Sequence, residues 1–505
     1  MASELTCPRP DLLPLLPGPK SLWHYFMLIC ETPHGSFNCG PLSNRIVEIA
    51  KEFGLEYEQD ESLNVVVRKP ASSPALEKIP MLCFQAHIDM VCQSDANVDF
   101  KSAGIKPKLE GNDLRGYIDD MATTLGADNG LGAAAMMAMM SDKFEHGPLE
   151  FLFTTDEEVG LIGAAAIKPG FFKSKTIINL DEEDLSICVG CCGGFQIDAT
   201  LDIQRAAVDY EAAHLQVEVK GLFGGHSGAD IEKQRANAIK LLGRLLAEAR
   251  LRIPEAGLLV NSFNVRAGAH NAIPRQSLAQ ITLKKSHVEP VKELFMTIRD
   301  QMKVEFTGIE PDVIVELSEV VPTCQPLDES STARLLRGII LAPSGVVRFD
   351  PVFKNLVESS STNTVLTLNS DENKAVFLIS SRSSSGSQLE YLKMYVKEFA
   401  TANGMTATPP SSAYPPWVPK YDAPIVKLTI EAYKEAIKTE PTVYVVHGGL
   451  ETSLLSNMGD NIECVAIGPM IRSPHTPQEA LEIDSVVPFW DLTMTLINKW
   501  NTTYQ

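Results

Sequence analysis

Basic residues are scarce in this sequence, and the shortage limits what the protein can bind. The 505 residues include 44 Lys and Arg against 64 Asp and Glu, which gives a formal net charge of −20. Nucleic acids and anionic membranes are bound through clustered basic side chains, so the composition argues against both as partners. It is compatible with neutral or cationic substrates and with metal ions, although net charge bears more on solubility than on chemistry.

Long hydrophobic runs and export signals are missing as well. The longest stretch of low polarity, residues 130–140, is far shorter than the ~20 residues that cross a bilayer. The first 20 residues have no basic lead, and prolines interrupt their apolar patch, so we expect no signal peptide. The ten cysteines are scattered, with no repeated pair at metal-finger spacing, and the adjacent pair Cys191-Cys192 is expected in the core. These observations predict a cytoplasmic protein.

The first 195 residues have the pattern of an α/β domain. Two amphipathic helices are predicted within residues 20–55, and a helix of small residues over 128–142. Apolar, β-branched runs at 63–67, 79–87, 149–155 and 175–180 predict buried strands. Strands that are apolar on both faces and alternate with helices indicate an α/β sheet with at least some parallel pairing.

The pattern changes after residue 195. Residues 213–220 and 278–284 alternate like half-exposed strands, 230–252 and 288–304 have the pattern of helices with charged faces, and a similar cycle follows at 310–403. A Pro- and Ser-rich stretch at 409–419 is typical of a linker, and α/β character returns beyond it. We therefore predict an α/β domain with a mixed, mostly parallel sheet between helices, formed by 1–195 and 406–505, and an inserted α+β domain at 196–405.

Several acidic or imidazole side chains end or follow the predicted strands. In an open α/β sheet the carboxyl ends of the strands form the binding crevice. Taken singly, each is a weak signal, because a lone histidine is more often a core residue and an acidic pair is usually a solvated turn. Their coincidence at three strand ends favours a functional site. The segments are His87-Ile88-Asp89, Asp128, Glu157-Glu158, Asp181 and His475.

These residue types fit a metal-dependent hydrolase. Adjacent Glu157 and Glu158 in extended chain point to opposite sides, so one can bind metal while the other moves a proton as general base and acid. Asp89 can accept the free imidazole N–H of His87. A carboxylate such as Asp128 can bridge two ions about 3.5–4 Å apart. Mixed His and carboxylate ligands suit zinc best, with cobalt or manganese as substitutes.

The same blocks resemble the metal-site motifs of the dizinc aminopeptidase and aminoacylase family, which includes the carnosinases and bacterial tripeptidases. Within that family the chain is most similar to the aminoacyl-histidine dipeptidases (Xaa-His dipeptidases, peptidase D). The likeness covers most of residues 20–500. It is carried by His87-Ile88-Asp89-Met90, Gly126-Ala127-Asp128-Asn129-Gly130, Thr155-Asp156-Glu157-Glu158, Asn179-Leu180-Asp181, Gly224-Gly225-His226-Ser227-Gly228, and the stretches 271–275, 446–451 and 467–479.

The resemblance implies a metal site for two zinc ions. By position, His87 and Asp181 would bind one zinc, Glu158 and His475 the other, and Asp128 would bridge both. The bond Asp128-Asn129 aligns with a peptide bond that is often cis in this family. The α/β part would then be the catalytic domain, and the insert a lid or dimerisation domain.

The resemblance also implies catalytic and substrate-binding residues. Glu157 would be the catalytic base, Asp89 the partner of His87, and His226 a lid histidine that polarises the scissile carbonyl. Candidates for holding the substrate or shaping its pocket are Asn271, Arg382, His447 and Glu451.

The function that follows is hydrolysis of small peptides, of Xaa-His type such as β-alanyl-histidine, by a cytoplasmic homodimer. Whether His226 acts within its own subunit or on the partner stays open. Alternatives in the same class are a broader di- or tripeptidase and an N-acyl amino acid deacylase. An alternative in a different class is a catalytically inactive relative that serves as a binding protein.

Overall fold

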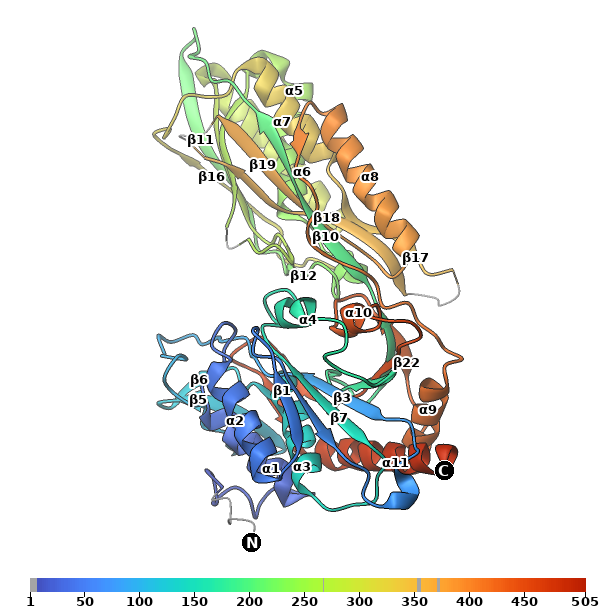
Figure 1. Ribbon diagram of the computed structural model, residues 1–505. Coiled ribbons are helices and arrows are strands. Elements are labelled where there is room, and N and C mark those ends of the chain that lie inside the picture. Colours follow the sequence, from blue (N-terminus) through green and yellow to red (C-terminus); the bar gives the residue numbers. More distant parts are fainter. Residues whose placement is uncertain (1–6, 267, 352–355, 370–372) are drawn as a thin grey trace. The chain divides into compact units, whose positions relative to one another are not determined.

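The computed structural model describes residues 7–266, 268–351, 356–369 and 373–505. The chain divides into two compact units, shown in Figure 1. Unit 1 takes the described parts of Met1–Cys191, together with Trp417–Val446 and Leu450–Gln505, and unit 2 takes Cys192–Pro416 and His447–Gly449. The α/β part of the chain is therefore split in the sequence, and a three-residue segment near the C-terminus belongs to the inserted unit.

A mixed sheet of eight described strands forms the centre of unit 1. Its order is β1-β2-β7-β3-β8-β23-β9-β22. The pairs β7-β3, β3-β8, β8-β23 and β9-β22 are parallel, whereas β1-β2, β2-β7 and β23-β9 are antiparallel. The strands are β1 (Glu56–Gln59), β2 (Val65–Lys69), β3 (Leu82–His87), β7 (Leu149–Thr154), β8 (Thr176–Asn179), β9 (Ile187–Cys191), β22 (Val443–Val446) and β23 (Glu463–Ala466).

Helices and a smaller sheet complete unit 1. Every residue of β3, β7 and β8 is buried, which is the pattern of strands covered on both faces. The helices are α1 (Lys20–Glu31), α2 (Gly40–Glu52), α3 (Ala127–Ser141), α4 (Ile162–Ala166), α9 (Pro424–Ile437), α10 (Thr452–Leu455) and α11 (Val486–Tyr504). The smaller sheet contains β4 (Lys108–Glu110), β5 (Asp113–Ile118), β6 (Met121–Thr123), β24 (Ile471–Arg472) and β25 (Ala480–Glu482).

Unit 2 is an antiparallel sheet covered by helices. Residues along β10, β11 and β15 alternate between buried and partly exposed, as expected when helices cover one face only. The described strands are β10 (Gly193–Asp202), β11 (Ala212–Lys220), β13 (Leu259–Val265), β15 (Ser277–Lys284), β16 (Ile314–Glu319), β17 (Ser344–Phe349), β18 (Val357–Leu368), β19 (Lys374–Ser383), β20 (Thr406–Ala407) and β21 (Ser411–Tyr414). The helices are α5 (Ala238–Arg252), α6 (Val288–Glu305), α7 (Glu329–Leu341) and α8 (Gly386–Ala402), and a separate ribbon pairs β12 (Gly225–His226) with β14 (Ala272–Ile273).

The predicted fold class, α/β with an α+β insert, is confirmed. Two details differ from the prediction. Part of the predicted linker at 409–419 forms β21, which pairs with β10. The residues of β21, Ser411–Tyr414, stand between two Pro-Pro pairs and can therefore donate backbone hydrogen bonds that the prolines cannot. The helix predicted over 230–252 begins only at Ala238, where the side chain of Asn237 caps it by accepting from the backbone N–H groups of Ile239 and Lys240.

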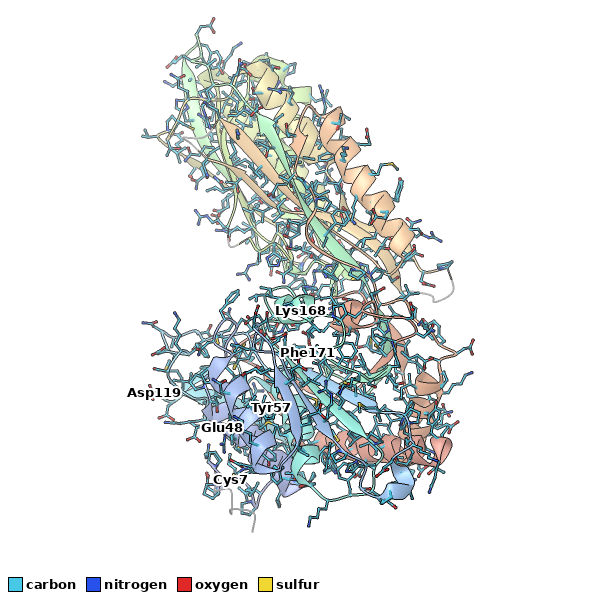
Figure 2. All side chains as sticks on the ribbon, in the orientation of Figure 1. Cys7, Glu48, Tyr57, Asp119, Lys168 and Phe171 are labelled. Atoms are coloured by element: carbon cyan, nitrogen blue, oxygen red, sulfur yellow. The ribbon has the colours of Figure 1, made fainter. Side chains whose placement is uncertain are left out.

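Side chains fill the interior of each unit (Figure 2). In unit 2 a continuous apolar core joins residues of the sheet to residues of α5, α6, α7 and α8. Among the residues that the structure describes, no helix is both long enough and apolar enough to cross a membrane. The role of unit 1 as a catalytic domain and of unit 2 as a lid stays a prediction at this point.

Candidate metal centre

Three parallel strands of unit 1 end at the same edge of the sheet. In the register of β3 and β7, His87 lies opposite Thr154, and in that of β3 and β8, Gln85 lies opposite Asn179. His87 is the last residue of β3, Glu157 follows the end of β7 by three residues, and Asp181 follows the end of β8 by two. The topology gathers side chains that are far apart in the sequence.

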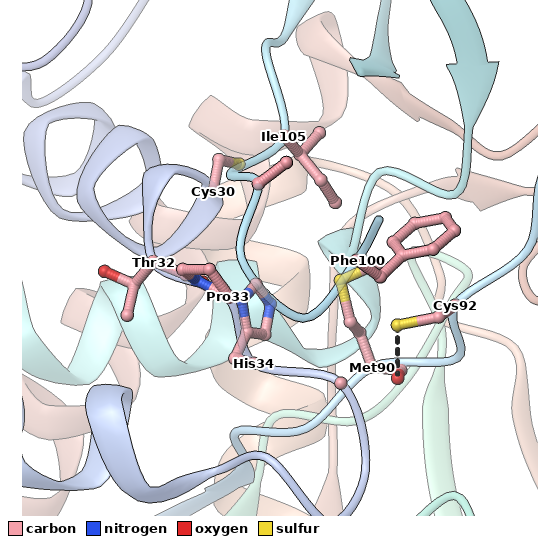
Figure 3. A pocket seen from close by; sticks show the side chains of 10 residues that line it. Cys30, Thr32, Pro33, His34, Met90, Cys92, Phe100 and Ile105 are labelled. Carbon is pink, nitrogen blue, oxygen red and sulfur yellow. Dashed lines mark hydrogen bonds between the residues drawn. The ribbon is translucent and has the colours of Figure 1, made fainter. Parts of the chain in front are cut away.

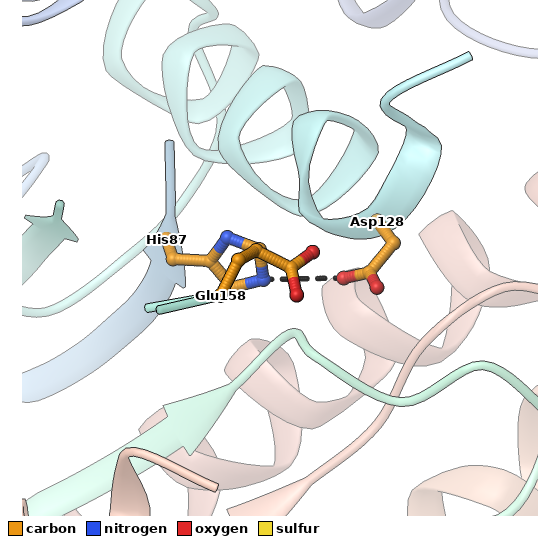
Figure 4. Close-up of side chains that lie close together, drawn as sticks. All are labelled: His87, Asp128 and Glu158. Atoms are coloured by element: carbon orange, nitrogen blue, oxygen red, sulfur yellow. Dashed lines mark hydrogen bonds and ion pairs between the residues drawn. The ribbon is translucent and has the colours of Figure 1, made fainter. Parts of the chain in front are cut away.

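His87 and Asp128 meet at this edge, as Figure 4 shows. The Nε2 atom of His87 lies 3.1 Å from Oδ1 of Asp128 and 3.3 Å from Oδ1 of Asp181. Asp128 belongs to the first turn of α3, and its peptide bond to Asn129 is cis, as the resemblance implied. The Asn129 side chain donates to Asp181 at 2.9 Å, which fixes that carboxylate beside the imidazole.

His475 brings the second half of the cluster together. It lies in the loop between β24 and β25, and its backbone has a positive φ of 61°. Its Nε2 atom is 3.0 Å from Oδ2 of Asp128 and 3.0 Å from Oε2 of Glu158. Asp128 therefore presents one oxygen to each histidine.

Asp89 organises the backbone around the cluster. Its carboxylate accepts from the backbone N–H groups of Glu157 at 2.9 Å and Glu158 at 3.2 Å, and from the Ser36 hydroxyl at 2.9 Å. The Nδ1 atom of His87 lies 3.0 Å from the backbone oxygen of Asp89 and 3.5 Å from its carboxylate. The nearer partner of the imidazole is thus the carbonyl, and the Asp89 carboxylate holds mainly the pair of glutamates.

The pKa values reflect an excess of buried negative charge. Burial raises the pKa of Glu157 well above its usual range, and burial together with Asp128 raises the pKa of Glu158 to about 7. Burial also raises the pKa of Asp181, to about 6. The pKa of His475 rises to about 12, because hydrogen bonds with Asp128 and Glu158 outweigh the opposing effect of burial.

The donor set fits a divalent cation. One group, the side chains of His87, Asp128 and Glu158, has ligand atoms within 4.8 Å of one another. The Oε1 atom of Glu158 is buried and has no hydrogen-bond partner in the described structure, so it is available as a ligand. Imidazole nitrogens and carboxylate oxygens are ligands that zinc, cobalt and manganese accept. Positive ions would balance the buried carboxylates better than the two histidines can.

Glu451 lies in the interior behind the cluster. It is completely buried, and its Oε2 atom accepts from the Gln85 side chain and the Thr154 hydroxyl, each at 2.5 Å. Asn179 in turn donates to Gln85 at 2.7 Å. This network joins the ends of β3, β7 and β8. The resemblance suggested that Glu451 contacts the substrate or shapes its pocket. Its complete burial favours a different role, in which it supports the strand ends.

His226 has a defined tautomer in unit 2. Its Nδ1 atom accepts from the backbone N–H groups of Gly228 at 3.3 Å and Ala229 at 2.9 Å. A neutral ring that accepts at Nδ1 carries its hydrogen at Nε2, which makes Nε2 a donor. The ribbon pairing of β12 with β14 fixes the backbone of His226, and the N–H of Ser227 donates to the backbone oxygen of Asn271 at 2.7 Å.

Arg382 and His447 lie in the same unit as His226. Arg382 Nη1 donates to the Tyr414 hydroxyl at 3.0 Å, and its Nη2 lies 3.5 Å from His226 Nε2. His447, in the three-residue segment that belongs to unit 2, has its Nε2 atom 2.8 Å from the Ser360 hydroxyl. Burial, with Arg382 nearby, lowers the pKa of His447 to about 3, so this imidazole is neutral.

Two further residues, Tyr414 and Glu479, are prominent in the structure but are not among the residues predicted from the sequence. Tyr414 lies in the predicted linker, where nothing marked it as a partner of Arg382. Glu479 accepts hydrogen bonds from the loop that carries Asp128. Its position four residues after His475, in a block already tied to the site, is the signal that could have found it.

A sheet edge that gathers histidines and carboxylates in this way fits a metal-dependent hydrolase. Residues 83–499 match the model of peptidase family M20/M25/M40, so the chain belongs to that family. It is accordingly an enzyme that hydrolyses peptide bonds.

Individual relatives cover nearly the whole chain. The cytosol non-specific dipeptidase of Escherichia coli (strain K12) is 34% identical over 489 residues, which are 95% of this chain and 98% of that protein. The crystal structure of the aminoacylhistidine dipeptidase from Vibrio alginolyticus has a TM-score of 0.80 and 34% identity, with 96% of this chain and 97% of that chain covered. The aminopeptidase PepT from Bacillus cereus, at 15% identity and a TM-score of 0.56 over 95% of this chain and 98% of its own, shares the fold.

Proposed function

We propose that the protein is a dizinc dipeptidase that acts on Xaa-His dipeptides such as β-alanyl-histidine. The observation that carries the proposal is the arrangement around Asp128, whose two carboxylate oxygens each face a different histidine. Such a carboxylate suits a bridging role between two cations. The two relatives at 34% identity, which are named as a non-specific dipeptidase and an aminoacylhistidine dipeptidase, support the substrate class.

The side chains divide into two ligand groups. His87 and Asp181 would hold one zinc ion, and His475 and Glu158 the other, with Asp128 shared between them. The distances support this division, because each histidine Nε2 lies close to one carboxylate of its own group and to one oxygen of Asp128. When bound, zinc supplies Lewis acidity that lowers the pKa of water and polarises a carbonyl group; cobalt and manganese can substitute.

Glu157 is the proposed general base. Its raised pKa suits a carboxylate that accepts a proton from the attacking water and returns it to the departing amine. Its backbone N–H is held by Asp89, as is that of Glu158. Asp89 thus fixes the backbone of both glutamates, so that Glu158 is placed to bind metal and Glu157 to transfer the proton.

His226 and Arg382 are the proposed donors to substrate oxygens. Both Nε2 of His226 and Nη2 of Arg382 carry hydrogens, so their 3.5 Å separation sets two donors side by side. One carbonyl or carboxylate oxygen could accept from both, which supports His226 as the group that polarises the scissile carbonyl and Arg382 as a carboxylate holder. Asn271 and His447 are proposed to shape the same subsite, because their backbone oxygens lie beside Ser227 and Gly228, the two residues that follow His226.

A substrate panel tests the proposed activity. The protein is freed of metal by a chelator, reloaded with zinc, cobalt or manganese, and assayed with β-alanyl-histidine, several α-dipeptides, a tripeptide and an acetyl amino acid. We expect metal-dependent hydrolysis of dipeptides, highest with a C-terminal histidine, and about two zinc ions per chain by elemental analysis. Preference for the tripeptide or the acetyl amino acid would point to the broader peptidase or to the deacylase, and failure to bind metal would refute the metal site.

We further propose that the enzyme is a cytosolic homodimer, with unit 1 as catalytic domain and unit 2 as lid. The location is supported by the E. coli relative, which is named a cytosol dipeptidase. Light scattering tests the dimer. Mixing inactive Glu157→Gln and His226→Ala proteins under conditions that exchange subunits tests where His226 acts: recovered activity means that it serves the partner subunit, and no recovery means that it serves its own.

A further inference from the structure

The loop that precedes Asp128 is held by a carboxylate from a distant part of the chain. One oxygen of Glu479 accepts from the backbone N–H groups of Leu125 at 2.8 Å and Gly126 at 3.1 Å. The other accepts from those of Ala127 at 2.8 Å and Asp128 at 3.4 Å. Four consecutive backbone donors therefore converge on a single side chain.

Two of the four donors, Ala127 and Asp128, belong to the start of α3, where the backbone of Asp128 and Asn129 departs from regular helix. The first N–H groups of a helix have no partner within the helix, and their partial positive charge favours an anion. Gly126, the capping residue of α3, has no side chain to satisfy them. Glu479 is only 2% exposed, so its hydrogen bonds to these donors are protected from water.

The opposite side of the loop is packed as tightly. Gly126 has a positive φ of 73°, and a Cβ atom there would lie 2.9 Å from Sδ of Met90 and 3.2 Å from Nε2 of His34. Both side chains line the small pocket drawn in Figure 3, together with Cys30 and Cys92. The loop is thus confined between Glu479 and the side chains of the pocket, and it has little freedom to carry Asp128 elsewhere.

Glu479 also belongs to the loop of His475. It follows His475 by four residues, and its own backbone N–H donates to the carbonyl of Thr476 at 3.0 Å. The same side chain therefore joins the loop that supplies Asp128 to the loop that supplies His475. These are the two residues whose side chains meet at 3.0 Å in the candidate metal centre.

We propose that Glu479 is a positioning residue for the metal site, which sets the Asp128 carboxylate relative to His475 and thereby determines how tightly the site binds divalent cations. Its carboxylate oxygens accept from the backbone N–H groups of residues 125–128, and it acts on the site through that backbone. The inference rests on the proposed function, because it presupposes that the cluster binds metal.

The test compares Glu479→Gln and Glu479→Ala with a matched control. The glutamine side chain has one oxygen in place of two, and its amide nitrogen cannot accept, so two of the four backbone donors lose their partner. The control is Glu150→Gln, because Glu150 is also completely buried and accepts from the backbone N–H groups of Lys173 and Ser174, at the other end of β7. Zinc and cobalt affinity are measured by competition with a chelator of known affinity, metal stoichiometry by elemental analysis, and stability by denaturation of the metal-free proteins.

We expect both Glu479 variants to bind zinc and cobalt roughly 10–100-fold more weakly than the wild type, the range known for residues that orient ligands. The control should lose stability but keep its metal affinity. Wild-type affinity in the Glu479 variants overturns the inference while leaving the metal site intact. Equal loss of affinity in Glu150→Gln also overturns it, because the effect is then general destabilisation. A wild-type protein that binds no metal overturns both the inference and the proposed function.

Discussion

Replacement of Asp89 by asparagine should disturb the positions of Glu157 and Glu158 without removing any proposed metal ligand. Asp89 accepts from the backbone N–H groups of Glu157 and Glu158 and from the hydroxyl of Ser36. Asparagine has nearly the same shape but offers only one accepting oxygen. If that oxygen keeps the Glu157 N–H, the amide nitrogen faces Ser36 and the N–H of Glu158.

The cost can be worked out from these contacts. The hydroxyl of Ser36 can turn and accept from the new amide, so that contact survives. The N–H of Glu158 meets another donor and loses its partner. One unsatisfied donor in a buried site costs about 1–3 kcal/mol of stability. Because the lost bond orients a proposed metal ligand and the neighbouring base, we also expect kcat to fall roughly 10–100-fold.

The assay combines urea denaturation of the metal-free protein with steady-state kinetics on β-alanyl-histidine at saturating zinc. Glu150→Gln is again the control, since it should lower stability without changing kcat. An Asp89→Asn enzyme with wild-type stability and kcat within twofold of the wild type would refute the reasoning. A loss of stability alone would show that the Asp89 carboxylate supports the fold but does not position Glu157 and Glu158.

Three further predictions concern other parts of the molecule. Glu157→Gln should keep its metal content by elemental analysis while kcat falls roughly 10²–10⁴-fold, the contribution of a general base, and near-wild-type turnover would exclude Glu157 from that role. Glu310→Gln should loosen the loop of His226, because the buried Glu310 carboxylate accepts from the N–H groups of Phe223 and Ala236 on either side of that loop. Hydrogen exchange of those two amides should speed up, and kcat should fall with metal content unchanged. Unaltered exchange would show that Glu310 does not hold the loop. Arg68→Leu leaves its buried partner Glu150 without its cation, 3.0 Å away in the wild type, and should cost about 3–5 kcal/mol in denaturation experiments; a cost below about 1 kcal/mol would mean that the backbone donors to Glu150 suffice.

The sequence predicts much of unit 1 because its signals are local. Buried strands appear as continuous apolar runs, and parallel strands end at a common edge, so the residues that follow β3, β7 and β8 can be expected to lie together. His87, Glu158 and Asp181 could be named on that ground. Asp128, at the start of α3, and His475, in a loop, follow none of these strands, so only the family resemblance assigns them to the same metal site.

Other features escape a sequence reading because they depend on contacts between distant segments. Glu479 and the backbone N–H of Leu125, to which it binds, are 354 positions apart, and a backbone donor leaves no trace in the sequence. The hydrogen bonds from the backbone N–H groups of Glu157 and Glu158 to Asp89 cannot be predicted from the sequence for the same reason. His447 directly follows β22 of unit 1 in the sequence but belongs to unit 2, where its Nε2 atom lies 2.8 Å from the Ser360 hydroxyl.

The strand order of the unit 1 sheet has a consequence for synthesis of the chain on the ribosome. Strand β23 lies between β8 and β9, although its residues, Glu463–Ala466, are made long after Thr176–Asn179 of β8. At about 5–20 residues per second, the nascent chain waits roughly 15–60 s between the two. During that interval the apolar edge of β8 has no partner, and an open edge invites pairing with other chains. Translation that stops before residue 463 therefore leaves β8 with an open apolar edge, and the nascent protein needs protection until Glu463–Ala466 have emerged.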